Sequence, residues 1–439
     1  MKSFCKIYSV LVVLLCPAIS FGQSHEITLD SAKSAALNYS YNIKNSQLNT
    51  QSAYLDKISV ESSRLPDVSV GGMLIYGIKD FVKPVPPLLN KGIGNFYFAG
   101  VSAMEPIYMG GKIQTGIELA KLQIEVEKIR EKQTSDSVLL LTEQKYWRLV
   151  QLQEQIKVLK ANEILVDGIL KQMQDMLASG LIARNDLLKV KVRRSEVLLN
   201  ESKLSNGHKL AIFDFCLYIG LPYDSSLVAT DTLANAKPAS ALFVSPEQAL
   251  LQNQDVHLLQ RNLEVQQLQK KLTKADYLPT ISAGVNAGQF GSIGHSDINN
   301  FMPVAFGTVS IPISGLIWGS GKSKMKQQAI KEEIAKNTLV DGQRRIQTGI
   351  LKSWYDMDDA YQQIVFAKEN LVQATENLKV NRDNYSSGLI SITELLDAQA
   401  SYQQASSSIV DAYAQYRSKM ASYLYVTGKM DTTTPIQQP

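Results

Sequence analysis

One stretch decides the fold of this chain: Tyr385-Ser-Ser-Gly388-Leu389-Ile390-Ser391-Ile392-Thr393-Glu394-Leu395-Leu396-Asp397. A similar stretch lies 208 residues earlier and reads Leu177-Ala-Ser-Gly180-Leu181-Ile182-Ala183-Arg184-Asn185-Asp186-Leu187-Leu188. In both, a Ser-Gly-Leu-Ile break separates a long polar helical pattern from an amphipathic pattern that contains Leu-Leu. This arrangement is typical of two antiparallel helices joined by a tight turn.

The similarity extends over the whole chain, since matched landmarks in the two halves stay 206 to 213 residues apart. We therefore divide the sequence into a signal peptide over 1–22, a first repeat over 23–222 and a second repeat over 246–428. An inter-repeat segment over 223–245 has no clear pattern, and the tail over 429–439 is expected to be flexible. The repeat takes precedence over a domain count based on length.

The first residues resemble a secretory signal. Lys2 and Lys6 precede an apolar run that ends at Cys16, and the small residues Ser20 and Gly22 suit cleavage after Gly22. Lipidation at Cys16 is a weaker alternative, because the two leucines before it are not the small residues that such a signal needs. The mature protein is therefore expected to leave the cytoplasm.

The composition of the remaining chain excludes several classes of protein. It has 43 basic and 41 acidic residues, a charge of +2, and a single cysteine, Cys216. No disulfide can form within one chain, and no strong field attracts nucleic acid. No apolar run reaches the roughly 18 residues of a membrane helix. Membrane strands remain possible, since about ten alternating residues suffice for one.

The first repeat is predicted to contain a helix over 27–64 and a strand hairpin over 67–109, whose connecting loop is rich in proline. A long helix over 112–178 and a helix over 181–219 follow. At 1.5 Å per residue the long helix would span about 100 Å, which few globular domains need.

The second repeat is predicted to follow the same plan. Its elements are a helix over 246–277, a hairpin over 280–314, a long helix over 322–385 and a helix over 389–427. A three-four spacing of apolar residues in the first long helix predicts a coiled-coil seam, in which only Glu163 is polar. The seam consists of Leu149, Leu152, Ile156, Leu159, Val166, Leu170, Met173 and Leu177. The second repeat keeps this register and places alanine at alternate seam positions, which would allow closer helix packing.

The predicted fold class is mainly α with membrane β. Long antiparallel coiled-coil helices would form a cylinder that could hold a lumen. Four strands per chain are too few for a membrane barrel, which needs at least about eight, so several copies must combine. Three copies would supply twelve strands and twelve helical columns around a lumen.

These features together resemble the TolC-like outer-membrane efflux proteins, over roughly residues 26–428. The most specific part is the Tyr385-x-x-Gly388 turn followed by Glu394-Leu-Leu-Asp397, supported by Pro106-Ile-x-x-Gly-Gly-Lys112 at the strand-to-helix turn. The resemblance implies a trimeric duct, with a barrel in the outer membrane and a tunnel across the periplasm.

The resemblance also assigns roles at the tunnel tip. It implies that the turns at Gly180 and Gly388 lie at the periplasmic end, and that Glu394 and Asp397 form an acidic pore constriction. Rings of carboxylates in a narrow pore attract cations. Ser391-x-x-Glu394 is equally a capping box, which requires no pore.

The resemblance further implies a latch that holds the tip shut, to which Tyr385 and Asp186 would contribute. The arginine that the family places two residues after the turn glycine is here Ile390, so part of the latch is missing. Arg184 is a conceivable substitute.

Other motifs are set aside. The run Gly319-Ser-Gly321-Lys322-Ser323 looks like the end of a phosphate-binding loop, but the required first glycine is Leu316. Four scattered histidines predict no metal site, and no catalytic set or cofactor site is recognisable.

Trp147 and Trp354 are interpreted as packing residues. Aromatic residues of the strands could form an interfacial girdle: Phe96, Tyr97, Phe98, Phe301 and Phe306.

The predicted function is a passive, homotrimeric outer-membrane exit duct of a tripartite efflux system, and not an enzyme. The expected partners are a periplasmic adaptor, an inner-membrane pump of RND or ABC type, and outer-membrane lipid, with no nucleic acid. The cargo would be drugs, toxic compounds or metal ions. An outlet for type I protein or peptide secretion is an alternative within the class. A secreted coiled-coil scaffold without a pore is the alternative from another class, although a scaffold has no use for two strand hairpins.

Overall fold

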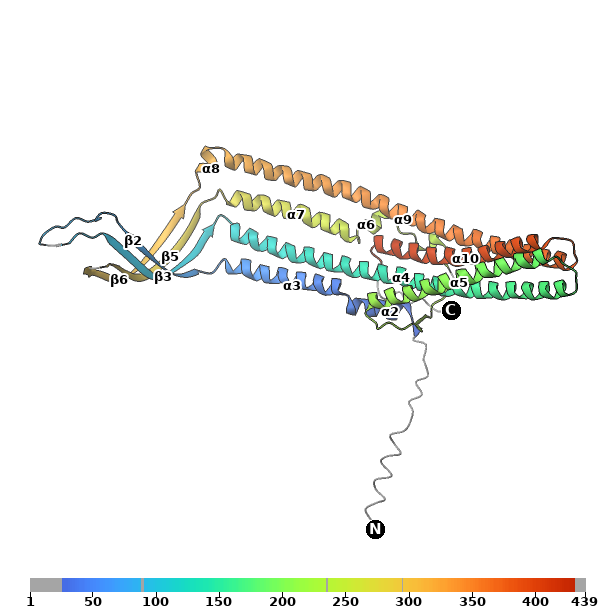
Figure 1. The fold of residues 1–439 in the computed structure, drawn as a ribbon. Helices are drawn as coiled ribbons and strands as arrows, with labels where there is room; N and C mark the ends of the chain where they lie inside the picture. The colour runs from blue at the N-terminus through green and yellow to red at the C-terminus, as the bar shows by residue number, and fades with distance from the viewer. Residues whose placement is uncertain (1–25, 88–90, 234–235, 294, 431–439) are drawn as a thin grey trace, which may run out of the picture.

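The computed structural model describes residues 26–87, 91–233, 236–293 and 295–430. The predicted signal peptide and most of the predicted tail lie outside these residues. Strands lie at one end of an elongated molecule and helices run from them to the other end (Figure 1). Within the described residues, no helix is both long enough and apolar enough to span a membrane.

The two repeats share two shorter helices, a pair of strands, a long helix and a final helix in the same order, while β1 occurs only in the first and α8 only in the second. The first contains β1 (Glu26–Ile27), α2 (Leu29–Tyr39), α3 (Tyr41–Ser62), β2 (Asp67–Tyr76), β3 (Asn95–Met109), α4 (Lys112–Ala178) and α5 (Arg184–Ile219). Between the repeats lie β4 (Val228–Ala229) and the short 3-10 helix η1 (Ala239–Leu242). The second contains α6 (Pro246–Leu250), α7 (Gln254–Ala275), β5 (Thr280–Ser292), β6 (His295–Ser310), α8 (Ser314–Ile317), α9 (Ser320–Ser386) and α10 (Ile392–Val426).

Two long helices form the frame of the molecule. Each of α4 and α9 has 67 residues, which corresponds to about 100 Å. Shorter helices lie beside them, α3 and α7 toward the strands and α5 and α10 toward the far end (Figure 1). The chain thus forms columns in which a pair of short helices covers the length of one long helix, as the sequence predicted.

Left-handed glycines end α5 and α10 at the points where each column passes from one short helix to the next. Gly220 closes α5 at φ 77°, and Gly428 follows α10 at φ 70°. A Cβ at Gly220 would lie 2.0 Å from the Tyr39 ring, and one at Gly428 would lie 2.7 Å from the Gln252 carbonyl oxygen. Only glycine fits both the backbone conformation and the space at these joints.

The inter-repeat segment binds the middle of the columns together. β4 pairs in parallel with β1, and Asp231 accepts hydrogen bonds from the Leu29 backbone N–H at 3.0 Å and the Tyr146 hydroxyl at 2.5 Å. The Tyr416 hydroxyl donates to the Lys237 carbonyl at 2.6 Å. Buried tyrosines of the long columns therefore give structure to a segment that showed no pattern in the sequence.

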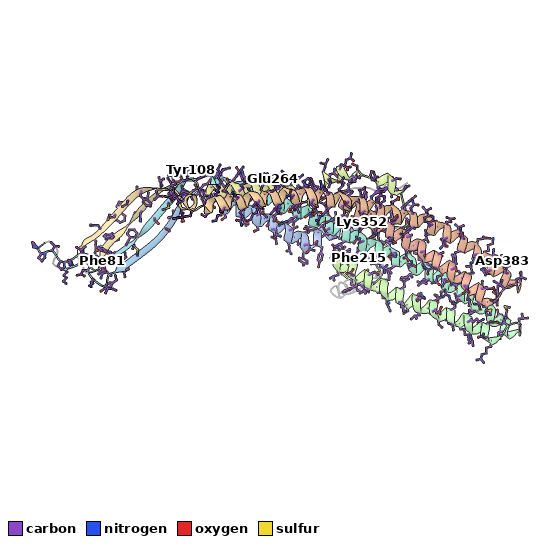
Figure 2. All side chains as sticks on the ribbon, turned by 90° about the horizontal axis from the view of Figure 1, so that it is seen from above. Phe81, Tyr108, Phe215, Glu264, Lys352 and Asp383 are labelled. Carbon is purple, nitrogen blue, oxygen red and sulfur yellow. The ribbon has the colours of Figure 1, made fainter. Side chains whose placement is uncertain are left out.

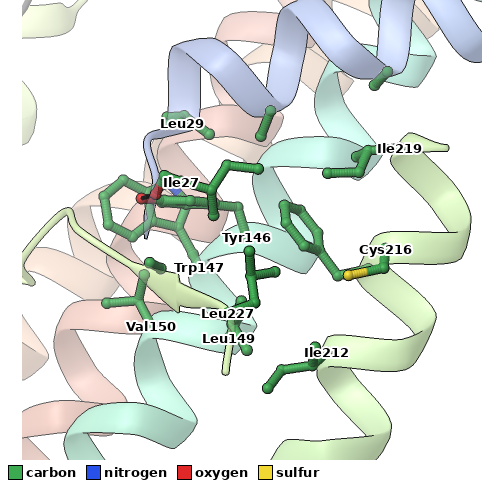
Figure 3. Close-up of a cluster of buried hydrophobic side chains, with 14 of the residues drawn as sticks. Ile27, Leu29, Tyr146, Trp147, Leu149, Val150, Ile212, Cys216, Ile219 and Leu227 are labelled. Carbon is green, nitrogen blue, oxygen red and sulfur yellow. Dashed lines mark hydrogen bonds between the residues drawn. The ribbon is translucent and has the colours of Figure 1, made fainter. Parts of the chain in front are cut away.

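Apolar packing surrounds this segment. Tyr146, Phe215 and Ile219 lie in one cluster that joins α4, α5 and β1 (Figure 3). A second cluster joins α9, α10 and the η1 region around Met357 and Tyr423. The predicted packing role of Trp147 is confirmed, since it is 3% exposed, and Trp354 packs partly buried against the second cluster.

The predicted seam is also confirmed. Leu149, Val166 and Met173 are fully buried in α4, as are Met357 and Ile364 in α9. Both long helices are polar overall, and this stripe packs their far-end halves against the neighbouring helices.

The four long strands form one antiparallel sheet in the order β2-β3-β5-β6. The outer strands β2 and β6 therefore each have one unpaired edge within the described sheet. Every residue of β2 is exposed, and large apolar side chains are exposed on several strands, among them Val70, Tyr76 and Phe301. At the end away from the helices, Phe96 stacks between Phe81 and Phe290 (Figure 2 labels Phe81).

Two predicted helices are interrupted. The helix predicted over 27–64 begins only at Leu29 and breaks at Ser40, where ψ is 118°. The helix predicted over 246–277 breaks between Leu250 and Gln254, where the Asn253 side chain caps α7. Neither break contains glycine or proline, and in both places the chain bends at the level of the inter-repeat segment.

The left-handed turn glycines give a test of the fold. Replacing Gly388 by alanine should lower the free energy of unfolding by about 1–2 kcal/mol, because a Cβ is strained at φ 72°. Gly180→Ala should behave alike. Gly349→Ala, inside α9 with no atom within 4 Å of its added Cβ, should instead be neutral or raise stability by up to about 1 kcal/mol. Thermal unfolding followed by circular dichroism measures this, and equal effects at Gly388 and Gly349 would contradict the turn geometry.

Candidate functional site

The end of the molecule away from the strands carries both helical turns and all the predicted site residues. Each long helix ends in the same way. Gly180 and Gly388 have φ 73° and 72°, and Leu181 and Leu389 donate their backbone N–H groups back to Met176 and Asn384 at 2.9 Å. These bonds close Schellman motifs, which reverse the chain within a few residues.

A small apolar core fixes the two hairpins against each other. Its buried members come from three helices: Met173, Leu187, Val190, Ile392 and Leu395. The partly buried Tyr385 packs against this core. The tip is therefore one packed unit that joins both repeats, and we name it the tip core.

Tyr385 is a hydrogen-bond donor inside this unit. Its hydroxyl donates to the Met173 Sδ at 2.9 Å. Burial, with a smaller contribution from the negative charge of Asp186, raises the pKa of the Tyr385 phenol above its ordinary value of 10.0. The hydroxyl therefore stays protonated across the physiological range. Asp186 lies near enough to influence Tyr385 electrostatically, and the bond that the resemblance implies between them stays a prediction.

The acidic residues of the tip occupy equivalent positions in the two repeats. Asp186 and Glu394 are each the third residue of their helix, and Lys189 stands where the second repeat has Asp397. In the first repeat, Lys189 forms an ion pair with Asp186 at 3.3 Å. The first repeat thus balances its own charge at this level, whereas the second carries two acids.

Glu394 has a structural role. Its carboxylate accepts from the Ser391 backbone N–H at 2.7 Å, and the Ser391 hydroxyl accepts from the Glu394 N–H at 3.3 Å. This is the predicted capping box, and it holds an exposed carboxylate at the mouth of the helix. The equivalent helix α5 begins after Ala183, which has no side-chain cap.

Asp397 differs from Glu394. Its side chain is exposed one turn further along α10, and in the described part of the chain it makes no ion pair. Arg184, the candidate substitute for the missing latch arginine, is likewise exposed and forms no ion pair with any described residue. Its latch role stays a prediction.

The structure adds a polar network that the sequence analysis missed. Gln399 is fully buried and donates to the Asn162 side chain. Arg193 donates to Gln399 at 3.3 Å and to Gln403 at 3.0 Å, so α4, α5 and α10 are cross-linked above the tip core. Lys189 adds a bond to Thr393 at 3.2 Å. Such residues look like ordinary polar helix positions in a sequence, because only their burial distinguishes them.

A shallow groove runs along α4 beside the first turn. Its walls come from Gly168, Lys171, Gln172, Asp175, Met176 and Ser179. No group of three or more metal-ligating side chains occurs within the described ranges.

Residues 245–424, which make up nearly all of the second repeat, match the family described as outer membrane efflux protein. No curated protein matches the chain significantly. Solved structures resemble the chain over nearly its full length. The Campylobacter jejuni CmeC outer membrane channel is 16% identical, with a TM-score of 0.77 over 92% of this chain and 87% of that one.

Two further solved structures have a similar fold. The outer-membrane channel OprN is 16% identical, with a TM-score of 0.77 over 91% of this chain and 90% of that chain. The Neisseria gonorrhoeae MtrE outer membrane channel is 13% identical, with a TM-score of 0.73 over 92% and 91%. At these identities the likeness concerns the fold, and the family match adds the class of protein. The chain therefore has the fold of these outer-membrane channels, and its second repeat matches the outer membrane efflux protein family.

Proposed function

We propose that three copies of this chain close into one tube and form the passive exit duct of a tripartite efflux system. The observation that carries this proposal is that the sheet and the row of helices next to it both have outer edges without a neighbouring element. The sheet ends in β2 on one side and β6 on the other. The helices next to the sheet lie in the order α3-α4-α7-α9, so α3 and α9 occupy the two outer positions (Figure 1). Unpaired strand edges need a partner, and a ring of copies supplies one without leaving free ends.

The exposed side chains of the outer helices support closure by further copies. Leu48, Leu55 and Ile58 of α3 are 59–66% exposed, and Ile330 and Ile334 of α9 are 57–61% exposed. They repeat at helical spacing on polar helices, as expected for an apolar stripe awaiting a partner helix. A channel explains such stripes and the apolar strands together, whereas a secreted scaffold would leave both exposed.

The tip core is proposed as the closable end of the duct. Glu394 and Asp397 of three copies would place six carboxylates around the opening, since the lysine that balances charge in the first repeat has no counterpart in the second. Tyr385, Asp186 and the two glycine turns would hold the neighbouring hairpins together. Outward movement of the hairpins would then open the tunnel.

The proposed partners are those that the family resemblance implies. A periplasmic adaptor would bind around 180–186 and 388–397, and an inner-membrane pump of RND or ABC type would supply the energy, because the duct performs no chemistry of its own. The proposed cargo is small molecules such as drugs, toxic compounds or metal ions. Export of a protein or peptide through the same duct is the second candidate, and it requires a different pump rather than a different duct.

The first test of the duct is its assembly and conductance. Light scattering of the detergent-purified protein should give the mass of three chains, and planar-bilayer recordings should give long-lived, cation-selective steps. A folded monomer or dimer that never inserts would overturn the duct.

The acidic ring can be tested by changing charge and helix cap separately. Glu394→Gln combined with Asp397→Asn should reduce cation preference and block by trivalent cations, because the ring loses its negative charge. Ser391→Ala removes the cap but keeps both charges. It should lower stability by about 1 kcal/mol and leave selectivity unchanged.

Glu376→Gln with Asp383→Asn removes the same charge from the neighbouring helix α9, where both residues are exposed. If this control pair alters reversal potentials as much as the ring pair does, total charge rather than ring position is responsible.

The latch gives a further prediction. Tyr385→Phe keeps the ring in the tip core and removes the hydroxyl that donates to Met173. The closed-state conductance should rise, because the hairpins lose a polar contact. Tyr402→Phe, on α10 and partly buried, is the matched control and should leave the conductance unchanged. An unaltered conductance in Tyr385→Phe would mean that the tyrosine only packs.

A further inference from the structure

The two strand-to-helix connections of the repeats differ. Gly110 and Gly111 alone join β3 to α4, whereas residues 311–319 join β6 to α9 and include the short helix α8. Gly111 and Gly319 keep the equivalent left-handed conformation at φ 83° and 75°. The second connection is therefore the first one with an added loop.

The added loop exposes large apolar side chains. Ile311, Ile313 and Ile317 are 56–67% exposed, and Trp318 is 82% exposed. Val309, next to the end of β6, is 69% exposed, so exposed apolar residues occur both at the end of the strand and in the loop. Tyr108, the residue labelled at this level in Figure 2, marks the boundary between sheet and helices.

The loop is fixed by packing against Tyr277 and by its own backbone hydrogen bonds. The ring of Tyr277 lies against Gly315 and Gly321, where an added Cβ would come within 2.5 and 2.8 Å of it. The Ile317 and Trp318 backbone N–H groups donate to Ile313 and Ser314 at 3.0 Å. The apolar side chains are thus presented on a preformed support.

Two lysines without an ion-pair partner among the described residues follow this loop in the sequence. Lys322 and Lys326 are exposed and share one face of α9, since they are four residues apart. Neither forms an ion pair within the part of the chain that the structure describes. The equivalent positions of the first repeat are Gln114 and Glu118, so no basic pair exists there. We name Ile311, Ile313, Ile317, Trp318, Lys322 and Lys326 the α8 patch.

We propose that the α8 patch is a lipid-binding anchor that selects anionic phospholipid at the periplasmic surface of the outer membrane. The proposal rests on the outer-membrane duct proposed above. An indole and isoleucines suit the boundary between acyl chains and headgroups. Lys322 and Lys326, about one and two turns further along the chain from Trp318, attract a phosphate that carries net negative charge. The apolar side chains suit the acyl chains and the two ammonium groups suit the phosphate, so this combination matches the chemistry of phosphatidylglycerol.

The test uses the fluorescence of Trp318 in the full chain reconstituted into phosphatidylethanolamine vesicles. A minor fraction of the lipid is brominated on its acyl chains and is either phosphatidylglycerol or phosphatidylethanolamine. Trp147 and Trp354 lie at the middle of the long helices, away from the sheet. Quenching should be several-fold stronger with brominated phosphatidylglycerol, and Trp318→Phe should abolish it.

Charge variants separate recognition from simple proximity. Lys322→Gln with Lys326→Gln should lower the relative affinity for the anionic lipid by about 25-fold, given about fivefold for each lysine near a charged surface. High salt should lower it likewise. Lys352→Gln with Lys379→Gln removes the same charge further along α9, where both residues are exposed, and should preserve the preference.

Three results would contradict the anchor. Equal quenching by both lipids would overturn anionic selection. A protein that floats with the vesicles but shows no quenching of Trp318 would mean that another copy covers the patch, while the duct itself would stand. A protein that does not float with vesicles would overturn the duct together with the anchor.

Discussion

The lateral packing of two very long polar helices is the constraint on which this structure depends. Helices α4 and α9 each have 67 residues and carry only a narrow apolar stripe. Since helical propensity alone gives little stability in water, such helices persist only where neighbours cover the stripe along its whole length. The chain meets this requirement with pairs of shorter helices stacked end to end.

Where two short helices meet end to end they form a joint, and the needs of this joint explain the structure in the middle of the molecule. A helix that ends against the start of another must satisfy its last carbonyl groups and leave room for its neighbour. Gly220 and Gly428 do both, because a left-handed glycine closes the helix and has no Cβ to meet Tyr39 or Gln252. The inter-repeat segment then covers the joints with backbone groups of Asp231, Lys237 and Val244, which form hydrogen bonds with the hydroxyls of Tyr146, Tyr416 and Tyr423.

The two repeats share their geometry and differ in their chemistry. Gly111, Gly180 and Gly220 have counterparts 208 residues later with the same left-handed conformation. Their surroundings diverge at both ends of the molecule. At the tip, Lys189 is replaced by Asp397, which leaves the second hairpin negative. Near the sheet, the second repeat adds the α8 patch. The two repeats therefore share their backbone geometry, whereas their charge and exposed apolar surface differ.

The sequence by itself determined the repeat, both strand hairpins, the long helices and the turns at Gly180 and Gly388. These features depend on local signals, namely periodicity, proline, and glycine at positive φ, that act over short stretches of chain. The capping box was readable from Ser391 and its spacing, and the family resemblance pointed to Tyr385, Glu394 and Asp397, whose latch and pore roles remain proposals.

Only the tertiary structure decided where the shorter helices break, how residues 223–245 fold, and which polar helix residues are buried. Ser40 and Asn253 interrupt helices without glycine or proline, and Asn162 and Gln399 look like surface positions until neighbouring columns cover them. Each of these outcomes depends on partners far along the chain, such as Asp231 for the start of α2. Contacts of that kind leave no periodic pattern, because their free energy comes from packing between columns rather than from the local backbone.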